Sequence, residues 1–136
     1  MPCDRVFAVE LDVRDYECDL QGVVNNAHYL HYLEHARHLF LKARGIDFAA
    51  LSARGVHLVV TRAEIDFRYP LRSGDRFRVV VRVERESRLR FAFPQEIVRL
   101  PDEKPVVRAR IVGTGIDRSG RPALPPDVVA LLDLPS

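Results

Sequence analysis

The chain has 136 residues, of which 47% are hydrophobic and 29% charged, and its formal net charge at pH 7 is +2. This length and composition are typical of one folded domain, residues 1–136, and they exclude a disordered chain. The small net charge gives no reason to expect nucleic-acid binding, and no apolar run reaches the roughly 20 residues of a membrane-spanning helix.

The N-terminal residues and the cysteines indicate the cellular compartment. Residues 1–14 lack the apolar core of a signal peptide, so we expect a cytoplasmic protein. Cys3 and Cys18 do not have the close spacing of a zinc site or a disulfide framework, and we expect reduced thiols. All basic residues except Lys42 and Lys104 are arginines, which make bidentate contacts with phosphate.

A strand followed by one long helix opens the chain. The strand is predicted over residues 5–14, where apolar side chains occupy alternate positions. A loop over residues 15–24 contains Gly22. From about Asn25 to Arg44 the apolar residues recur at steps of three and four, which predicts a helix of about five turns with Gly45 as its C-cap.

The second half of the chain is predicted to be almost entirely strand. After a short connection over residues 46–54, four strands follow with turns of hairpin length between them. They cover residues 55–69, 76–86, a segment that begins at Leu89, and 106–116. Pro94 interrupts the third of these and predicts a bulge or an edge strand there, because proline cannot donate to the ladder. A short helix over residues 125–134 closes the chain.

This order of elements predicts an α+β domain, in which a curved antiparallel sheet of about five strands wraps around one long central helix. The helix is the natural cover for the apolar face of the sheet. Such a sheet leaves exposed edges, and pairing in a homo-oligomer would remove them.

Four histidines of the long helix raise the question of a metal site. His31, Glu34 and His35 spell the inverted zinc-protease motif, and His28 and His38 lie on the same side of the helix, away from the predicted sheet. Zinc would need a third protein ligand, and none can be identified, so we predict no metal site. A polar face in solvent or at a subunit contact is the competing interpretation, and a zinc hydrolase is the less favoured one.

Asp19 lies in the loop directly before the helix, where Gly22 permits a tight turn. The backbone N–H groups from Asn25 to His28 have no intrahelical acceptor and stand at the positive end of the helix dipole. Asp19 is therefore either a catalytic carboxylate that faces these donors or a residue that caps a turn. In the second case Asn25 or Asn26 is simply the N-cap.

The stretch VRDYECDLQGVVNNAHYLHYLEHAR resembles the signature of the hotdog-fold acyl-CoA thioesterases of the 4-hydroxybenzoyl-CoA thioesterase type. The positions that match the family pattern are Asp19, Gly22, Val24, Tyr29, Leu30, Glu34, Ala36 and Arg37. The segment FRYPLRSGD is also similar to the family, and the likeness spans about residues 5–131. The fold that the resemblance implies agrees with the one predicted from the periodicity.

The resemblance implies that the protein hydrolyses acyl-CoA, or an acyl thioester on a carrier protein, to free acid and thiol, as in lipid metabolism. Asp19 would attack the thioester carbonyl or activate a water molecule, and the backbone N–H of Asn26 would stabilise the oxyanion. No cofactor is expected, because coenzyme A is part of the substrate.

The resemblance also implies binding residues in two parts of the chain and a dimer or tetramer that completes the site. At the helix entrance the expected residues are Gly22, Val24, Asn25 and Tyr29. Val59 and Thr61 would form pocket walls toward a second subunit. Arg88 and Arg90 would bind the phosphates of coenzyme A or an acidic carrier protein, and a solvated arginine face is the alternative interpretation.

The chain departs from two subgroups of the family at the entrance. Its GVV resembles the Tol–Pal-associated thioesterase, and its VNNAHYL is similar to the long-chain acyl-CoA thioesterase. Val23 and Asn26 stand where one or the other subgroup has a histidine. The role of those histidines is absent here or is taken by another group. A catalytically weak acyl-thioester binding module is therefore the alternative function.

Overall fold

The computed structural model of the protein describes residues 6–133, so the thiol expected at Cys3 and the last residue of the predicted C-terminal helix lie outside the described residues. The elements, in chain order, are β1 (Val6–Asp12), η1 (Asp15–Glu17), α1 (Asn26–Ala43), α2 (Phe48–Ala53), β2 (His57–Phe67), β3 (Arg76–Arg82), β4 (Glu84–Arg85), β5 (Arg90–Leu100), β6 (Lys104–Ile116) and α3 (Pro126–Leu132).

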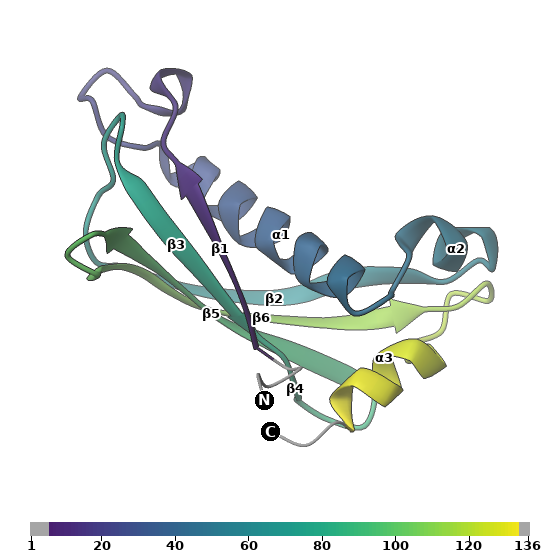
Figure 1. Ribbon diagram of the computed structural model, residues 1–136. Helices are drawn as coiled ribbons and strands as arrows, with labels where there is room; N and C mark the ends of the chain where they lie inside the picture. Colours follow the sequence, from purple (N-terminus) through teal and green to yellow (C-terminus); the bar gives the residue numbers. More distant parts are fainter. Residues whose placement is uncertain (1–5, 134–136) are drawn as a thin grey trace.

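The strands form one antiparallel sheet in the order β1-β3-β5-β6-β2, and the short strand β4 pairs with β5. The sheet curves around α1, which lies on its concave face (Figure 1). The predicted α+β architecture of a curved sheet around one long helix is therefore confirmed. The sheet has six strands where about five were expected, because the strand predicted over residues 76–86 is divided into β3 and β4.

The long helix forms where its periodicity and its cap residue predict it. The Asn25 side chain accepts a hydrogen bond from the backbone N–H of Ala27 and so caps α1. Gly45, just beyond the helix end, has a φ of +80°, a conformation that costs glycine little. One face of the helix is buried in the core: Tyr29, Tyr32, Leu33, Ala36, Phe40 and Leu41.

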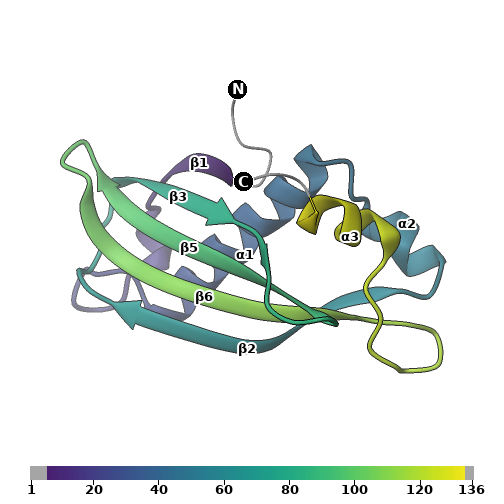
Figure 2. The same ribbon diagram turned by 90° about the horizontal axis from the view of Figure 1, so that it is seen from below.

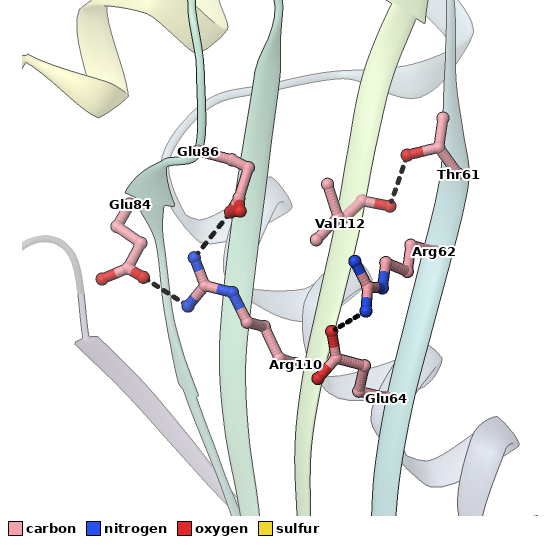
Figure 3. A network of polar contacts seen from close by, with 7 residues as sticks. All are labelled: Thr61, Arg62, Glu64, Glu84, Glu86, Arg110 and Val112. Carbon is pink, nitrogen blue, oxygen red and sulfur yellow. Dashed lines mark hydrogen bonds and ion pairs between the residues drawn. The ribbon is translucent and has the colours of Figure 1, made fainter.

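The two faces of the sheet differ sharply in chemistry. The concave face is apolar, and Phe77, Val79 and Ile97 on it are fully buried beneath α1. On the convex face opposite charges face each other across neighbouring strands. Glu96 lies opposite Arg108 and forms an ion pair with it, and Arg110 binds Glu84 and Glu86 (Figure 3). Cross-strand pairs of this kind stabilise the sheet and keep this face polar.

Two local features differ from the expected elements. The connection before β2 contains a short helix, α2, whose N-cap Asp47 accepts hydrogen bonds from the N–H groups of Ala49 and Ala50. Pro94 lies in the central strand β5, so the expected edge position is wrong, and no shift of register occurs there. Instead the pairing of β3 with β5 stops after Val81 and Gln95, and it resumes in the same register beyond Pro94, where Glu84 of β4 pairs with Ala92.

The short C-terminal helix closes one end of the core. α3 buries Val128, Leu131 and Leu132. It lies at the end of the domain where α1 ends, whereas the loop before α1 stands at the other end (Figures 1 and 2). Within residues 6–133, none of the helices is long and apolar enough to cross a membrane.

Candidate active site

The loop before α1 is a tight turn that closes on itself. The backbone N–H of Asp19 donates to the carbonyl of Val23 at 2.8 Å, and the N–H of Gly22 donates to the carbonyl of Asp19 at 3.0 Å. Gly22 has a φ of +79°, where a residue with a Cβ atom is disfavoured. The turn therefore holds Asp19 in front of the first turn of α1.

The two carboxylate oxygens of Asp19 differ in their hydrogen bonds. Oδ1 accepts hydrogen bonds from the N–H groups of Gln21 at 2.9 Å and Val23 at 3.4 Å, so this oxygen caps the turn. Oδ2 accepts none in the part of the chain that the structure describes, and the side chain is exposed in the single chain. The capping role thus engages one oxygen and leaves the other available.

The first backbone N–H of α1 is an open donor. Around it, the N–H of Asn25 donates to the carbonyl of Glu17, and the N–H groups of Ala27 and His28 donate to the side chain and carbonyl of Asn25. The N–H of Asn26 has no acceptor among residues 6–133. It points from the positive end of an 18-residue helix, which favours negative charge.

The wall opposite the turn is the segment that follows β2, and Tyr29 holds it in place. The hydroxyl of Tyr29 accepts a hydrogen bond from the N–H of Leu71 at 2.9 Å, and the carbonyl of Leu71 accepts one from the N–H of Val24 at 2.8 Å. The ring of Tyr29 contacts that of Phe67, with 5.7 Å between centroids. Burial raises the pKa of Tyr29, so its hydroxyl stays neutral.

A buried carboxylate anchors the loop to the helix from below. Tyr32 donates its hydroxyl to Oε1 of Glu17 at 2.8 Å, and the N–H of Arg14 donates to the same oxygen at 2.8 Å. Burial, reinforced by this hydrogen bond to Glu17, raises the pKa of Tyr32 strongly. This pair was not predicted from the sequence, since nothing in the local pattern indicates a hydrogen bond between two residues 15 positions apart.

A cleft of about 420 Å³ lies between the Asp19 turn, the start of α1 and the segment that follows β2. Its lining contains most of the residues expected at the helix entrance: Asp19, Val24, Asn25, Asn26 and Tyr29. Gly22 shapes the turn without lining the cleft. The other lining residues are Gln21, Val23, Phe67, Arg68, Tyr69 and Pro70, which were not expected as site residues. Four of them come from the segment FRYPLRSGD, whose likeness to the family was the only available signal.

The remaining expected residues lie in a different place. Val59, Thr61, Arg88 and Arg90 line a second cleft, of about 430 Å³, and this cleft shares no residue with the one around Asp19. Thr61 is the extra residue of a β-bulge in β2, and its hydroxyl donates to the carbonyl of Val112 at 3.3 Å (Figure 3). Within one chain the structure therefore does not bring these four residues to Asp19.

The histidines of α1 do not gather with other ligand-type side chains. His31, Glu34 and His35 are exposed, and His28 and His31 contact each other edge to face, with 5.6 Å between ring centroids. Among the described residues, no three His, Cys, Asp or Glu side chains are grouped so that they could hold a metal ion. The inverted zinc-protease motif therefore lacks the third ligand that such a site needs.

The chain is similar to several thioesterases. Residues 13–132 match the model of the thioesterase-like superfamily. Two chloroplastic acyl-acyl carrier protein thioesterases of Arabidopsis thaliana are 40% and 41% identical over 121 residues, which is 89% of this chain. The chain spans 64% of the length of these curated relatives, slightly less than two thirds.

Solved structures show the same architecture. A 1,4-dihydroxy-2-naphthoyl-CoA thioesterase from Synechocystis has a TM-score of 0.88 and 25% sequence identity, over 93% of this chain and 95% of that one. A hypothetical protein from Aquifex aeolicus has a TM-score of 0.85 and 27% identity, over 93% and 99% of the two chains. The hotdog fold expected from the sequence is confirmed.

Proposed function

We propose, since the chain belongs to the thioesterase-like superfamily, that it hydrolyses acyl thioesters of coenzyme A or of an acyl carrier protein in the cleft before α1. One observation carries this proposal. Within residues 6–133, a carboxylate with a free oxygen, on Asp19, and a backbone N–H without an acceptor, on Asn26, line the same cleft at the positive end of α1.

In the proposed reaction the thioester carbonyl oxygen accepts the hydrogen bond of the Asn26 N–H. As the carbonyl carbon is attacked, the charge on this oxygen grows, and the donor and the helix dipole stabilise it. Asp19 Oδ2 either attacks the carbon itself or takes a proton from an attacking water molecule. The C–S bond then breaks, its electron pair goes to sulfur, and the thiolate leaves and takes up a proton from water. If Asp19 attacks, water subsequently hydrolyses the mixed anhydride to the free acid.

The proposal includes thioesters of both coenzyme A and acyl carrier protein, because similar proteins act on one or the other. The Arabidopsis proteins are acyl-acyl carrier protein thioesterases, and the Synechocystis protein acts on a CoA thioester. Coenzyme A and acyl carrier proteins present the acyl group on the same kind of arm, so the chemistry at Asp19 is common to both. The cytoplasmic location expected from the sequence is part of this proposal.

A homo-oligomer would bring the residues of the second cleft close to Asp19, which a single chain does not do. β2 is the last strand of the sheet, and its apolar residues Val60 and Phe67 are 54% and 52% exposed. If the β2 strands of two copies paired antiparallel, the first residues of one strand would lie beside the last residues of the other. The partner's Val59 and Thr61, with Arg88 and Arg90 beside them, would then approach Phe67 and the Asp19 cleft.

The substitution Asp19→Asn tests the proposal. The asparagine oxygen can still accept the turn hydrogen bonds from Gln21 and Val23, so the loop is retained while the carboxylate is lost. Release of free thiol from a panel of acyl-CoAs, from acetyl through aryl to palmitoyl, and from acyl carrier protein thioesters is the measurement. We expect turnover to fall by about 10²- to 10⁴-fold.

Three outcomes would contradict the proposal. Turnover that persists in Asp19→Asn at the wild-type rate removes Asp19 from the mechanism. Binding of acyl-CoA without thiol release from any substrate would favour the acyl-thioester binding module instead. Wild-type turnover should also survive EDTA, since no step uses a metal, whereas its loss would support a zinc hydrolase built on His31 and His35.

A further inference from the structure

A third hollow lies between α1 and the sheet, apart from the Asp19 cleft. It has a volume of about 190 Å³. Its walls are mostly apolar, and Leu58, Val60, Phe91, Phe93 and Ile111 contribute to them. On one side α1 adds Glu34, Arg37 and His38. We call this hollow the Arg37 cavity.

Arg37 is held in a defined position by a buried glutamine. Its Nη1 donates to Oε1 of Gln95 at 3.0 Å, and Nε2 of Gln95 donates to the carbonyl of Leu33 at 3.0 Å. Gln95 is only 2% exposed and lies on the concave face of β5, where the neighbouring residues on that face are apolar. A polar residue in such a place is costly unless it is fully hydrogen-bonded, so this contact specifies the orientation of Arg37.

The guanidinium of Arg37 has more N–H donors than the described chain offers acceptors for them. It carries five N–H bonds, and Gln95 is its one hydrogen-bond acceptor within residues 6–133. No carboxylate of the described chain lies within 4.0 Å of it, although Glu34 is near enough to favour its charged form. Burial lowers the pKa of Arg37, because its surroundings solvate the charge less well than water does. A cation in this position is stabilised by a further oxygen acceptor.

The Arg37 cavity and the Asp19 cleft lie along the same side of α1. Asn26, Leu30, Arg37 and Leu41 fall within an arc of about 60° around the helix axis. β2 contributes Phe67 to the cleft and Val60 to the cavity, so both hollows lie between α1 and β2. Leu30, between them on the helix, is an exposed apolar residue, 45% accessible. An acyl chain that starts at Asn26 and runs along this side of α1 would pass Leu30 on its way to Arg37.

The helix geometry sets the length of this path. Asn26 and Arg37 are separated by about 16 Å along the helix axis, and an arginine side chain leans back toward the helix N-terminus. The remaining distance corresponds to about eight to ten carbon–carbon bonds of an extended chain.

We propose that the Arg37 cavity selects acyl groups that carry an oxygen acceptor near their far end, a hydroxyl or carboxylate about eight to ten bonds from the thioester. Arg37 donates to this oxygen, and Gln95 is the residue that positions Arg37. The inference rests on the proposed function, since it concerns the substrate of the same reaction.

The test compares matched substrates that differ only in the oxygen. Release of thiol is measured with decanoyl-CoA, ω-hydroxydecanoyl-CoA, the CoA ester of the ω-carboxylic acid, and β-hydroxydecanoyl-CoA as a positional control. For the wild type we expect kcat/KM to be about 10- to 100-fold higher for the two ω-oxygenated substrates than for decanoyl-CoA, the range for a hydrogen bond to a charged group. The β-hydroxy substrate should show no such preference.

Variants test whether Arg37 causes the preference for ω-oxygenated substrates. In Arg37→Met the ratio between ω-oxygenated and plain substrates should fall to about one. Gln95→Leu should reduce the same ratio partly, because the guanidinium loses its orientation, and Arg37→Lys should retain part of it. Arg82→Met, an exposed arginine on β3, should leave the ratio as in the wild type.

Several results would overturn the inference. A wild-type ratio near one does so without any variant, even if Arg37→Met does not fold. Equal losses on all substrates in Arg37→Met, together with a smaller particle by light scattering, would assign Arg37 to a contact between copies of the chain. Absence of thiol release from every substrate would instead contradict the proposed function itself, so the two failures are distinguishable.

Discussion

Replacing Asn26 with proline removes the proposed oxyanion donor and little else. Asn26 is the first residue of α1, the position at which proline is best tolerated in a helix. The preceding residue, Asn25, has φ −64° and ψ 139°, an extended conformation that is compatible with a following proline. The N–H that is lost has no acceptor within the described chain, so no internal hydrogen bond is broken.

The expected effects on stability and activity are therefore very different. The free energy of unfolding should change by less than about 0.5 kcal/mol, which corresponds to about 2 °C in Tm for a chain of this length. The rate constant for thioester cleavage should fall by about 10²- to 10³-fold, because one backbone donor to an oxyanion contributes about 3 to 4 kcal/mol. Thermal denaturation and thiol-release kinetics measure the two quantities on the same sample.

The matched control is Asn26→Ala, which keeps the N–H and removes only the side-chain amide. Its kcat should stay within about tenfold of the wild type, because the backbone donor survives. If the proline variant folds with an unchanged Tm and still turns over substrate as fast as the alanine variant, the Asn26 N–H is not the oxyanion donor. The mechanism proposed above would then lose its central element.

Three further predictions concern the anchor of the loop and the edge of the sheet. Tyr32→Phe leaves the buried Glu17 carboxylate without its hydroxyl donor and should lower the free energy of unfolding by about 1 to 3 kcal/mol in urea denaturation; a loss that cannot be measured would contradict the pairing. Because the pKa of Tyr32 is raised in the folded state, the unfolded chain loses this proton first as the pH rises. Stability should thus be constant with respect to this group below about pH 10 and decline above it, by up to about 1.4 kcal/mol per pH unit, and Tyr32→Phe should flatten the decline. Val60→Asp places a charge on the exposed edge strand β2 and should yield monomers with little turnover, as measured by light scattering and thiol release; an unchanged oligomeric state would contradict pairing through β2.

The order and type of the main elements could be predicted from the sequence because their signals are local. The apolar spacing of α1, the cap at Asn25 and the alternation in β1 and β3 each act over a few residues. α2 was missed because six residues carry too little periodicity to distinguish a helix from a loop. The effect of Pro94 was misjudged, since the sequence does not show that β3 ends opposite it.

The candidate site was only partly predictable for the same reason. Asp19, Asn25, Asn26 and Tyr29 lie within one turn and the start of one helix, so their proximity follows from local geometry and from the resemblance to a family. The far wall, from Phe67 to Pro70, was not identified as part of the site, because its place depends on the hydrogen bond between Tyr29 and Leu71 across 42 positions of the chain.

What the sequence by itself determined is the set of local structures: which segments are helix or strand, which faces are apolar, and which carboxylate stands before a helix N-terminus. Only the tertiary structure decided which distant segments share a hollow. It separated Val59, Thr61, Arg88 and Arg90 from Asp19 within one chain, and it set Gln95 against Arg37 in the core. The physical reason is that strand order and sheet curvature arise from packing the whole core, and no short stretch of residues encodes them.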